Sequence, residues 1–169
     1  KVDSGVTDVQ SILSKKANQP GYNDIGYSVY LDTIGRVRAN ISNGSAVIQN
    51  SSASNAEIAD EVMRIVQVSW DRSSLMNLFI DGVQADYKDV SSYDGLDITN
   101  NYFLYIGSNR PGTRKYLKAD VAEIIMYDRL LTTEETEGVY AYLESKYIPE
   151  PASMVLLGLG AVALLRRKK

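Results

Sequence analysis

The sequence predicts an all-β protein, an antiparallel β-sandwich, from three observations. Residues 25–31 alternate between apolar side chains and small or polar ones, which is the period of a strand with one buried and one solvated face. Further apolar stretches of strand length recur at short intervals. Turn-forming pairs separate them, namely Asn43-Gly44, Asp81-Gly82 and Pro111-Gly112. About seven short strands at this spacing are typical of two packed antiparallel sheets.

The expected strands can be placed in chain order. The clearest lie at 25–31 and 62–70, where Val62, Val66, Val68 and Trp70 keep the alternation and Arg64 interrupts it. The others are rich in β-branched and aromatic residues, and we place them at 9–13, 36–41, 75–80, 102–106 and 121–127.

A single helix is predicted at 132–147. Thr132 and Glu135 have the spacing of a capping box, while Glu134 and Glu137 place negative charge near the positive end of the helix dipole. One stripe on its surface is formed by Thr136, Tyr140, Leu143 and Tyr147. We expect this helix to lie against the sandwich and to close a domain that spans residues 1–148.

The composition excludes several kinds of chemistry. The chain has no Cys and no His, so disulfides, thiolate metal sites and the commonest general base are absent. Four of its 18 basic residues are the last four residues, which leaves 14 basic against 21 acidic residues in 1–151, a formal charge of −7. Because nucleic-acid phosphates require clustered Lys and Arg, no nucleic-acid partner is expected.

The C-terminus has three parts. A Pro-Glu-Pro motif comes first, at Pro149, Glu150 and Pro151, and a run of fourteen almost purely apolar residues follows at 152–165. Four cations close the chain: Arg166, Arg167, Lys168 and Lys169. As a helix the run would measure about 21 Å, which is short for a spanning helix of about 20 residues. Three features nevertheless favour a temporary membrane segment: the run lies at the end of the chain, prolines precede it, and four cations follow it. Such cations stay on the cytoplasmic side during export, so the folded domain would lie outside the membrane.

This arrangement resembles the PEP-CTERM sorting signal of bacteria. The resemblance implies an exported protein, anchored in the membrane by its C-terminus until an exosortase-type enzyme recognises residues 149–151 and cuts nearby. It further implies transient membrane insertion of 152–165, retention by 166–169, and a final location at the cell envelope, the surface or the extracellular matrix. A plain C-terminal anchor that is never cut is the alternative.

The body of the chain resembles a concanavalin A-like, laminin G-like jelly roll. The strings that carry the resemblance are Ile12-Leu13-Ser14-Lys15, residues 26–31, 78–82 and 104–107, and the segment 122–131 that runs into the helix. Complete domains of this kind have several more strands before the segment that matches 12–15. Since the chain also begins at Lys1 without an initiator Met or a leader, we expect an N-terminally incomplete domain.

Hydrolase activity is not expected. Glucanases with this fold place two or three carboxylates on alternate residues of one strand, and no such string occurs here. The nearest set, Asp120, Glu123 and Asp128, has spacings of three and five, which place the groups on different faces of a strand. Serines are plentiful, but no His is present to activate one.

The expected function is therefore a non-catalytic extracellular recognition, adhesion or matrix module that binds an extracellular polysaccharide or a surface protein. One alternative is an accessory domain of a secreted carbohydrate-active enzyme whose catalytic part lies upstream. A second is a purely structural matrix protein without a soluble ligand.

Two sets of residues are candidates for ligand contacts. Among twelve tyrosines, Tyr87 and Tyr93 lie in or beside loops and are candidates for stacking on sugar rings, whereas four others are predicted to be buried: Tyr27, Tyr127, Tyr140 and Tyr147. A weak calcium site is hypothesised at Asp86, Asp89 and Asp94, because Ca²⁺ needs only oxygen ligands. The alternative is a solvated loop whose aspartates cap turns.

Overall fold

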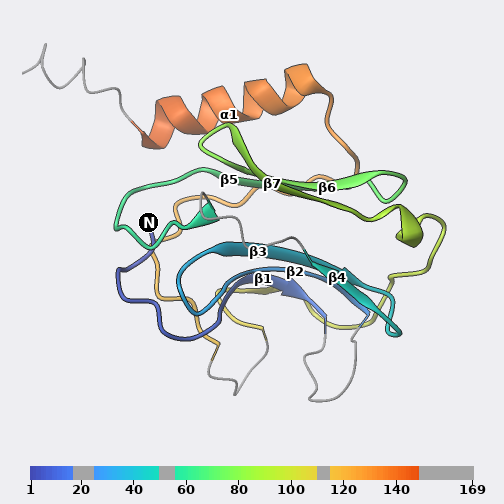
Figure 1. Cartoon of the computed structure of the whole chain (residues 1–169). Coiled ribbons are helices and arrows are strands. Elements are labelled where there is room, and N and C mark those ends of the chain that lie inside the picture. The colour runs from blue at the N-terminus through green and yellow to red at the C-terminus, as the bar shows by residue number, and fades with distance from the viewer. Residues whose placement is uncertain (17–24, 50–55, 110–114, 149–169) are drawn as a thin grey trace, which may run out of the picture. The chain divides into compact units, whose positions relative to one another are not determined.

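The computed structural model describes residues 1–16, 25–49, 56–109 and 115–148 (Figure 1). The sorting residues predicted at 149–151 and 166–169, and the apolar run between them, lie outside this part. The chain divides into two compact units, Lys1–Leu130 and Leu131–Lys169, which are described separately.

The first sheet has five antiparallel strands in the order β4-β3-β2-β1-β8. Their bounds are β1 (Gln10–Lys15), β2 (Gly26–Leu31), β3 (Val37–Ser42), β4 (Val47–Gln49) and β8 (Tyr105–Ile106). A β-bulge shifts the pairing of β1 with β2 between Ser11 and Leu13. Past the bulge the register is regular. Ser14 on β1 pairs with Ser28 on β2, and Ser28 pairs with Asn40 on β3.

The second sheet has three antiparallel strands in the order β5-β6-β7, with β5 at Val66–Trp70, β6 at Leu75–Ile80 and β7 at Val83–Asp89. The predicted Asp81-Gly82 turn joins β6 to β7, with φ angles of 50° and 75°. Positive φ at both central residues is what a tight hairpin needs, and Asp-Gly meets that need at low cost. A short 3₁₀ turn, η2 (Ser91–Tyr93), follows β7.

The two sheets stack as layers and enclose the hydrophobic core (Figure 1). One cluster joins Val29, Leu31 and Val37 of the five-stranded sheet to Leu78 and Ile80 of the other. A second cluster contains Ala39, Ile41, Met76, Val90 and Tyr93. The predicted antiparallel sandwich is confirmed, because alternate residues of strands from both sheets supply the buried apolar surface.

Several strand predictions are corrected. The strand expected at 62–70 begins only at Val66, since Arg64 is held by ion pairs before it. Residues 102–106 reduce to β8 (Tyr105–Ile106), and residues 121–127 form no strand. Strands β4 and β7 were not predicted, and β7 is too polar for an apolar pattern to show it.

The helix is confirmed as α1 (Thr133–Tyr147), with Thr132 as N-cap. The Glu135 N–H donates to Thr132 Oγ1 at 3.2 Å, and the Thr132 N–H donates to Glu135 Oε2 at 2.9 Å, which completes the predicted capping box. None of the fifteen helical residues is buried. The burial predicted for Tyr140 and Tyr147 depends on packing between the two units, so it stays a prediction. Tyr127 is 49% exposed and Tyr27 is half-buried. The packing of α1 on the sandwich stays a prediction.

Gly26 is expected to be a position where alanine destabilises the fold strongly. It has φ +126°, and a Cβ atom there would lie 2.0 Å from Lys15 O and 2.6 Å from Asn100 Nδ2. That amide donates to the carbonyls of both Lys15 and Ile25 and thereby ties β1 to β2. Backbone strain and overpacking together are expected to make Gly26→Ala cost roughly 2–5 kcal/mol of unfolding free energy.

Denaturant unfolding monitored by Trp70 fluorescence measures this cost, with Gly95→Ala as the matched control. Gly95 has φ +67° but nothing within 4 Å of an added Cβ, so its substitution carries backbone strain alone, about 1 kcal/mol. Equal losses in the two variants would contradict the steric argument.

Candidate functional site

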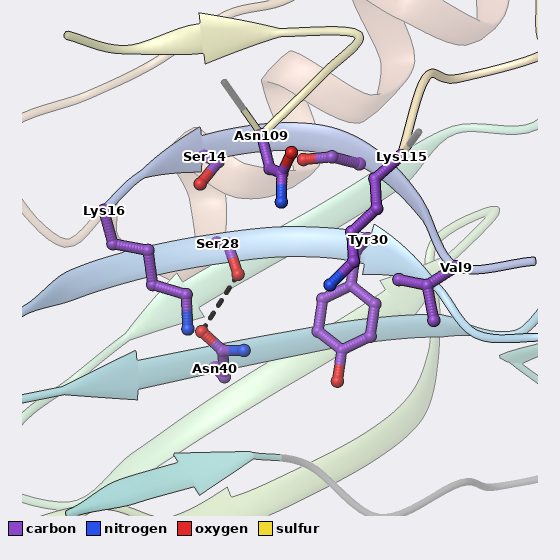
Figure 2. Close-up of a pocket in the computed structure, with 9 residues that line it drawn as sticks. Val9, Ser14, Lys16, Ser28, Tyr30, Asn40, Asn109 and Lys115 are labelled. Carbon is purple, nitrogen blue, oxygen red and sulfur yellow. Dashed lines mark hydrogen bonds between the residues drawn. The ribbon is translucent and has the colours of Figure 1, made fainter. Parts of the chain in front are cut away.

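A polar pocket lies on the face of the five-stranded sheet that points away from the hydrophobic core (Figure 2). Its volume is about 210 Å³. Most of the residues that line it have polar side chains, and they come from strands β1, β2 and β3 and from the segments at Asn109 and Lys115. The residues that define it are Ser11, Ser14, Ser28, Tyr30, Asn40 and Asn109, with Lys16, Lys115 and Val9 at its margin.

Strand register brings the central polar residues together. Ser14, Ser28 and Asn40 are consecutive cross-strand partners, so they form a row across the sheet. The Ser28 hydroxyl donates to Asn40 Oδ1 at 3.0 Å. Ser11 reaches the same face through the bulge, because residues 11 and 14 would point to opposite faces of a regular strand.

The polar groups of this pocket are unusually well buried. Ser11, Ser14, Ser28, Asn40 and Asn109 are each 1–6% exposed. The hydroxyls of Ser11 and Ser14 have no hydrogen-bond partner among the described residues. A buried polar group without a partner costs about 1–3 kcal/mol, so both hydroxyls are suited to bind a polar ligand or ordered water.

The charges around the pocket are mostly positive. Lys16 and Lys115 line it, and no Asp or Glu is among the described residues that do so. Burial raises the pKa of Tyr30, and Asp32 raises it further, whereas Arg38 and a hydrogen bond with Asn40 lower it. Asp32 is itself paired with Arg38 at 3.2 Å. The Tyr30 phenol therefore stays protonated at neutral pH.

The two tyrosines predicted to contact a ligand lie in different environments. Tyr87, on β7, is 60% exposed and remains accessible. Tyr93 is 2% exposed, belongs to the second core cluster and donates its hydroxyl to Ala46 O at 2.6 Å. Burial raises the pKa of Tyr93. This placement corrects the assignment of Tyr93, whose ring fills the core and is closed to a ligand.

The aspartates of the hypothesised calcium site bind backbone groups instead of converging. Asp86 Oδ1 accepts from the Tyr87 N–H at 2.8 Å, and Asp89 Oδ1 accepts from the Ser91 N–H at 2.8 Å. The hydrogen bonds from Ser91 lower the pKa of Asp89. Asp94 is the C-cap of η2. Within the described residues no three His, Cys, Asp or Glu side chains are grouped as metal ligands would be.

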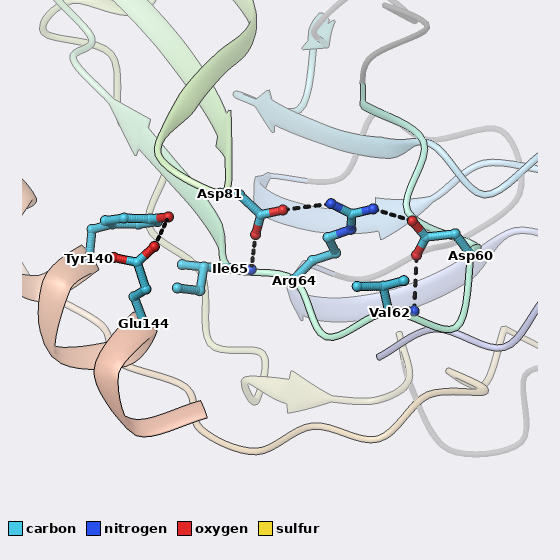
Figure 3. A network of polar contacts seen from close by, with 7 residues as sticks. All are labelled: Asp60, Val62, Arg64, Ile65, Asp81, Tyr140 and Glu144. Carbon is cyan, nitrogen blue, oxygen red and sulfur yellow. Dashed lines mark hydrogen bonds and ion pairs between the residues drawn. The ribbon is translucent and has the colours of Figure 1, made fainter. Parts of the chain in front are cut away.

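A second polar network is structural (Figure 3). Arg64 pairs with Asp60 and, at 2.8 Å, with Asp81, and these contacts raise the pKa of Arg64. Asp81 also accepts from the Ile65 N–H at 2.8 Å. The network thus fixes the start of β5 against the β6-β7 turn. In α1, Tyr140 donates to Glu144 at 2.9 Å, a contact within one helix face.

Sequence reasoning missed the pocket. The alternation at 25–31 predicts that Ser28 and Tyr30 face solvent, and alternation alone cannot show that polar positions on three neighbouring strands are covered and buried. The bulge in β1 is a further obstacle, because no residue pattern marks it. The available signal was the density of Ser and Asn at strand positions, where these residues are uncommon.

Comparisons with known proteins agree with the observed sandwich. Residues 1–136 match a laminin G-type model of the concanavalin A-like lectin/glucanases superfamily, and residues 148–169 match the PEP-CTERM protein-sorting motif. No curated protein shows a significant match. No helix of the described residues is long and apolar enough to cross a membrane, and the apolar run 152–165 lies outside them.

One similar solved structure is residues 221–444 of an S-layer domain-containing protein from Clostridium thermocellum ATCC 27405, with 18% identity and a TM-score of 0.35. The alignment covers 83% of this chain and 66% of that one, just under two thirds of its length. A likeness this distant carries no argument about function. The family matches do identify the chain, which belongs to the concanavalin A-like lectin/glucanases superfamily and carries a PEP-CTERM signal for export to the cell envelope and exosortase-type processing.

Proposed function

We propose that this protein is a non-catalytic carbohydrate-binding module that acts at the cell surface, and that the pocket on the five-stranded sheet is its binding site. The single observation that supports this most strongly is that the buried hydroxyls of Ser11 and Ser14, which line the pocket, have no hydrogen-bond partner in the part of the chain that the structure describes. The sorting signal supports an extracellular setting for this binding.

The chemistry of the pocket suits a sugar. Serine hydroxyls and asparagine amides can each donate and accept hydrogen bonds, as the hydroxyl groups of a sugar ring require. Tyr30 adds an aromatic side chain with a polar end beside them. A volume of about 210 Å³ is below that of a typical small-molecule site, so it fits about one ring of a longer chain.

Binding without cleavage is favoured by the positions of the carboxylates. Glycoside hydrolysis needs two of them about 5–9.5 Å apart at the scissile bond, and no described lining residue is acidic. Glu123 and Asp128 lie on the exposed segment 121–130, and Asp120 precedes it, so none of the three lines the pocket.

The test is glycan binding by Ser11→Ala and Ser14→Ala. We expect each substitution to leave the unfolding free energy unchanged or to raise it by up to about 1 kcal/mol, because a costly buried hydroxyl is removed. The same substitutions are expected to weaken glycan binding about fivefold to tenfold each, since one ligand hydrogen bond is lost.

Native affinity electrophoresis in gels that contain a soluble polysaccharide measures binding, and thermal melting measures stability. The full chain is kept soluble with a detergent that has no sugar headgroup. Ser92→Ala is the matched control, because Ser92 is exposed on η2 and does not line the pocket. Loss of stability in parallel with binding, or equal effects in Ser92→Ala, would contradict the proposal.

A further inference from the structure

The charge of the pocket contrasts with the charge of the region that contains it. Residues 1–151 have a formal charge of −7, yet the described residues that line the pocket include two lysines and no acidic residue. Asp32, whose charge acts on Tyr30, is paired with Arg38. The pocket is therefore a local positive site on an acidic domain.

The two lysines lie at opposite ends of β1. Lys16 directly follows this strand, and Lys115 lies beside its beginning, where the Ser11 N–H donates to Lys115 O at 3.1 Å. The chain around Lys115 is held by two more bonds, from the Leu117 N–H to Gly107 O and from the Lys118 N–H to Gln10 Oε1, both 2.8 Å. Figure 2 shows both lysine side chains directed into the pocket, with the serine and asparagine groups between them.

We propose that the ligand of this pocket is an acidic polysaccharide, in which the carboxylate or sulfate of a sugar ring is held by Lys16 and Lys115 while Ser11, Ser14 and Asn109 bind ring hydroxyls. This inference rests on the proposed function and names the ligand class. An anionic ring brings negative charge to both ammonium groups and hydrogen-bonding groups to the buried hydroxyls of Ser11 and Ser14. A neutral ring brings no charge, so it matches the positive lining of the pocket less well.

The test compares three probes on the full chain: polygalacturonate, which carries carboxylates, dextran sulfate, which carries sulfates, and neutral dextran. We expect polygalacturonate or dextran sulfate to bind at least tenfold more tightly than dextran, and the difference to shrink at high salt. Whichever of the two binds more tightly identifies the anionic group.

Variants then locate the effect. Lys115→Gln and Lys16→Gln are each expected to weaken binding of the anionic probe about tenfold and to weaken binding of dextran much less, while Lys115→Arg retains most of the affinity. Lys88→Gln is the matched control, since Lys88 is an exposed lysine on β7, in the other sheet. Thermal melting of each variant checks that the fold is intact.

The outcomes separate the two proposals. Equal binding of dextran and the anionic probes, with loss in Ser14→Ala, would overturn the anionic ligand and leave carbohydrate binding standing. Equal losses in Lys88→Gln and Lys115→Gln would overturn the assignment to this pocket. Absence of binding to all three probes, and to the extracellular polymer of the producing bacterium, would overturn both proposals.

Discussion

Replacing Pro149, Glu150 and Pro151 with alanine is expected to abolish C-terminal processing in a host that has an exosortase. The three residues match the recognition motif of the PEP-CTERM signal, whose family model covers residues 148–169. A sorting enzyme that recognises a short motif has little else to bind on its substrate. Loss of the Pro-Glu-Pro motif is therefore expected to block C-terminal processing almost completely. The unprocessed chain should accumulate in the membrane fraction. Intact-mass spectrometry of the envelope protein measures the outcome.

Deleting Arg166–Lys169 is expected to block maturation by a different route. The apolar run 152–165 is short for a spanning helix, so its retention depends on the four cations that follow it. Without them the segment should slip through the membrane before it is cut. Replacing Lys168 and Lys169 with arginine keeps the charge and should preserve the mature mass. An unchanged mature mass in both the alanine variant and the deletion would refute this account of sorting.

The parts of the fold that could be predicted depend on local rules. The capping box of Thr132 and Glu135 is set by two residues three positions apart, and the Asp81-Gly82 turn by two neighbours. Alternation likewise placed β2, which has one face in the core, and the apolar composition of 75–80 placed β6. These features need no information about distant parts of the chain.

The pocket could not be predicted because it depends on pairing between strands. Ser14, Ser28 and Asn40 are separated by 12 to 26 positions in the sequence, and only the observed register makes them neighbours. Ser11 joins them through a bulge. A polar residue at an outward strand position is ordinarily solvated, so the sequence pattern favoured the wrong environment for all four.

The positions of the tyrosines were equally dependent on tertiary structure. Tyr93 stands among polar loop residues, which favoured an exposed ring. In the structure η2 turns the chain back after β7, the Tyr93 N–H donates to Val90 O at 2.8 Å, and the ring enters the core beside Val90. Tyr127 lies in an apolar segment that favoured burial, yet no described strand pairs with that segment and the ring is exposed.

Residues 1–148, without the sorting signal, are expected to self-associate through an apolar strip. We define the apolar strip as the segment 121–130, in which every described residue is exposed. Its large apolar side chains are 37–49% exposed: Val121, Ile124, Ile125, Met126, Tyr127 and Leu130. Contiguous exposed apolar surface in a segment that belongs to no described strand favours association between copies.

The β8 edge of the five-stranded sheet is a second surface for association, besides the apolar strip. Its terminal strand β8 has only two residues, and Phe103 and Ile106 beside and within it are 77% and 55% exposed. A short edge strand alone is a weak template, but together with the apolar strip it gives the same copy two surfaces for association. We therefore expect oligomers that grow with concentration, as well as a broad, concentration-dependent thermal transition.

Light scattering coupled to size-exclusion chromatography measures the association over a range of protein concentrations. Ile125→Lys with Tyr127→Lys is expected to shift the population strongly towards monomer, because charges on an unpaired segment oppose pairing with another copy. Ile34→Lys is the matched control, since Ile34 is 49% exposed in the turn between β2 and β3 and lies outside the apolar strip. A sharp, concentration-independent melt of monomeric 1–148 would show that the strip is covered within one chain.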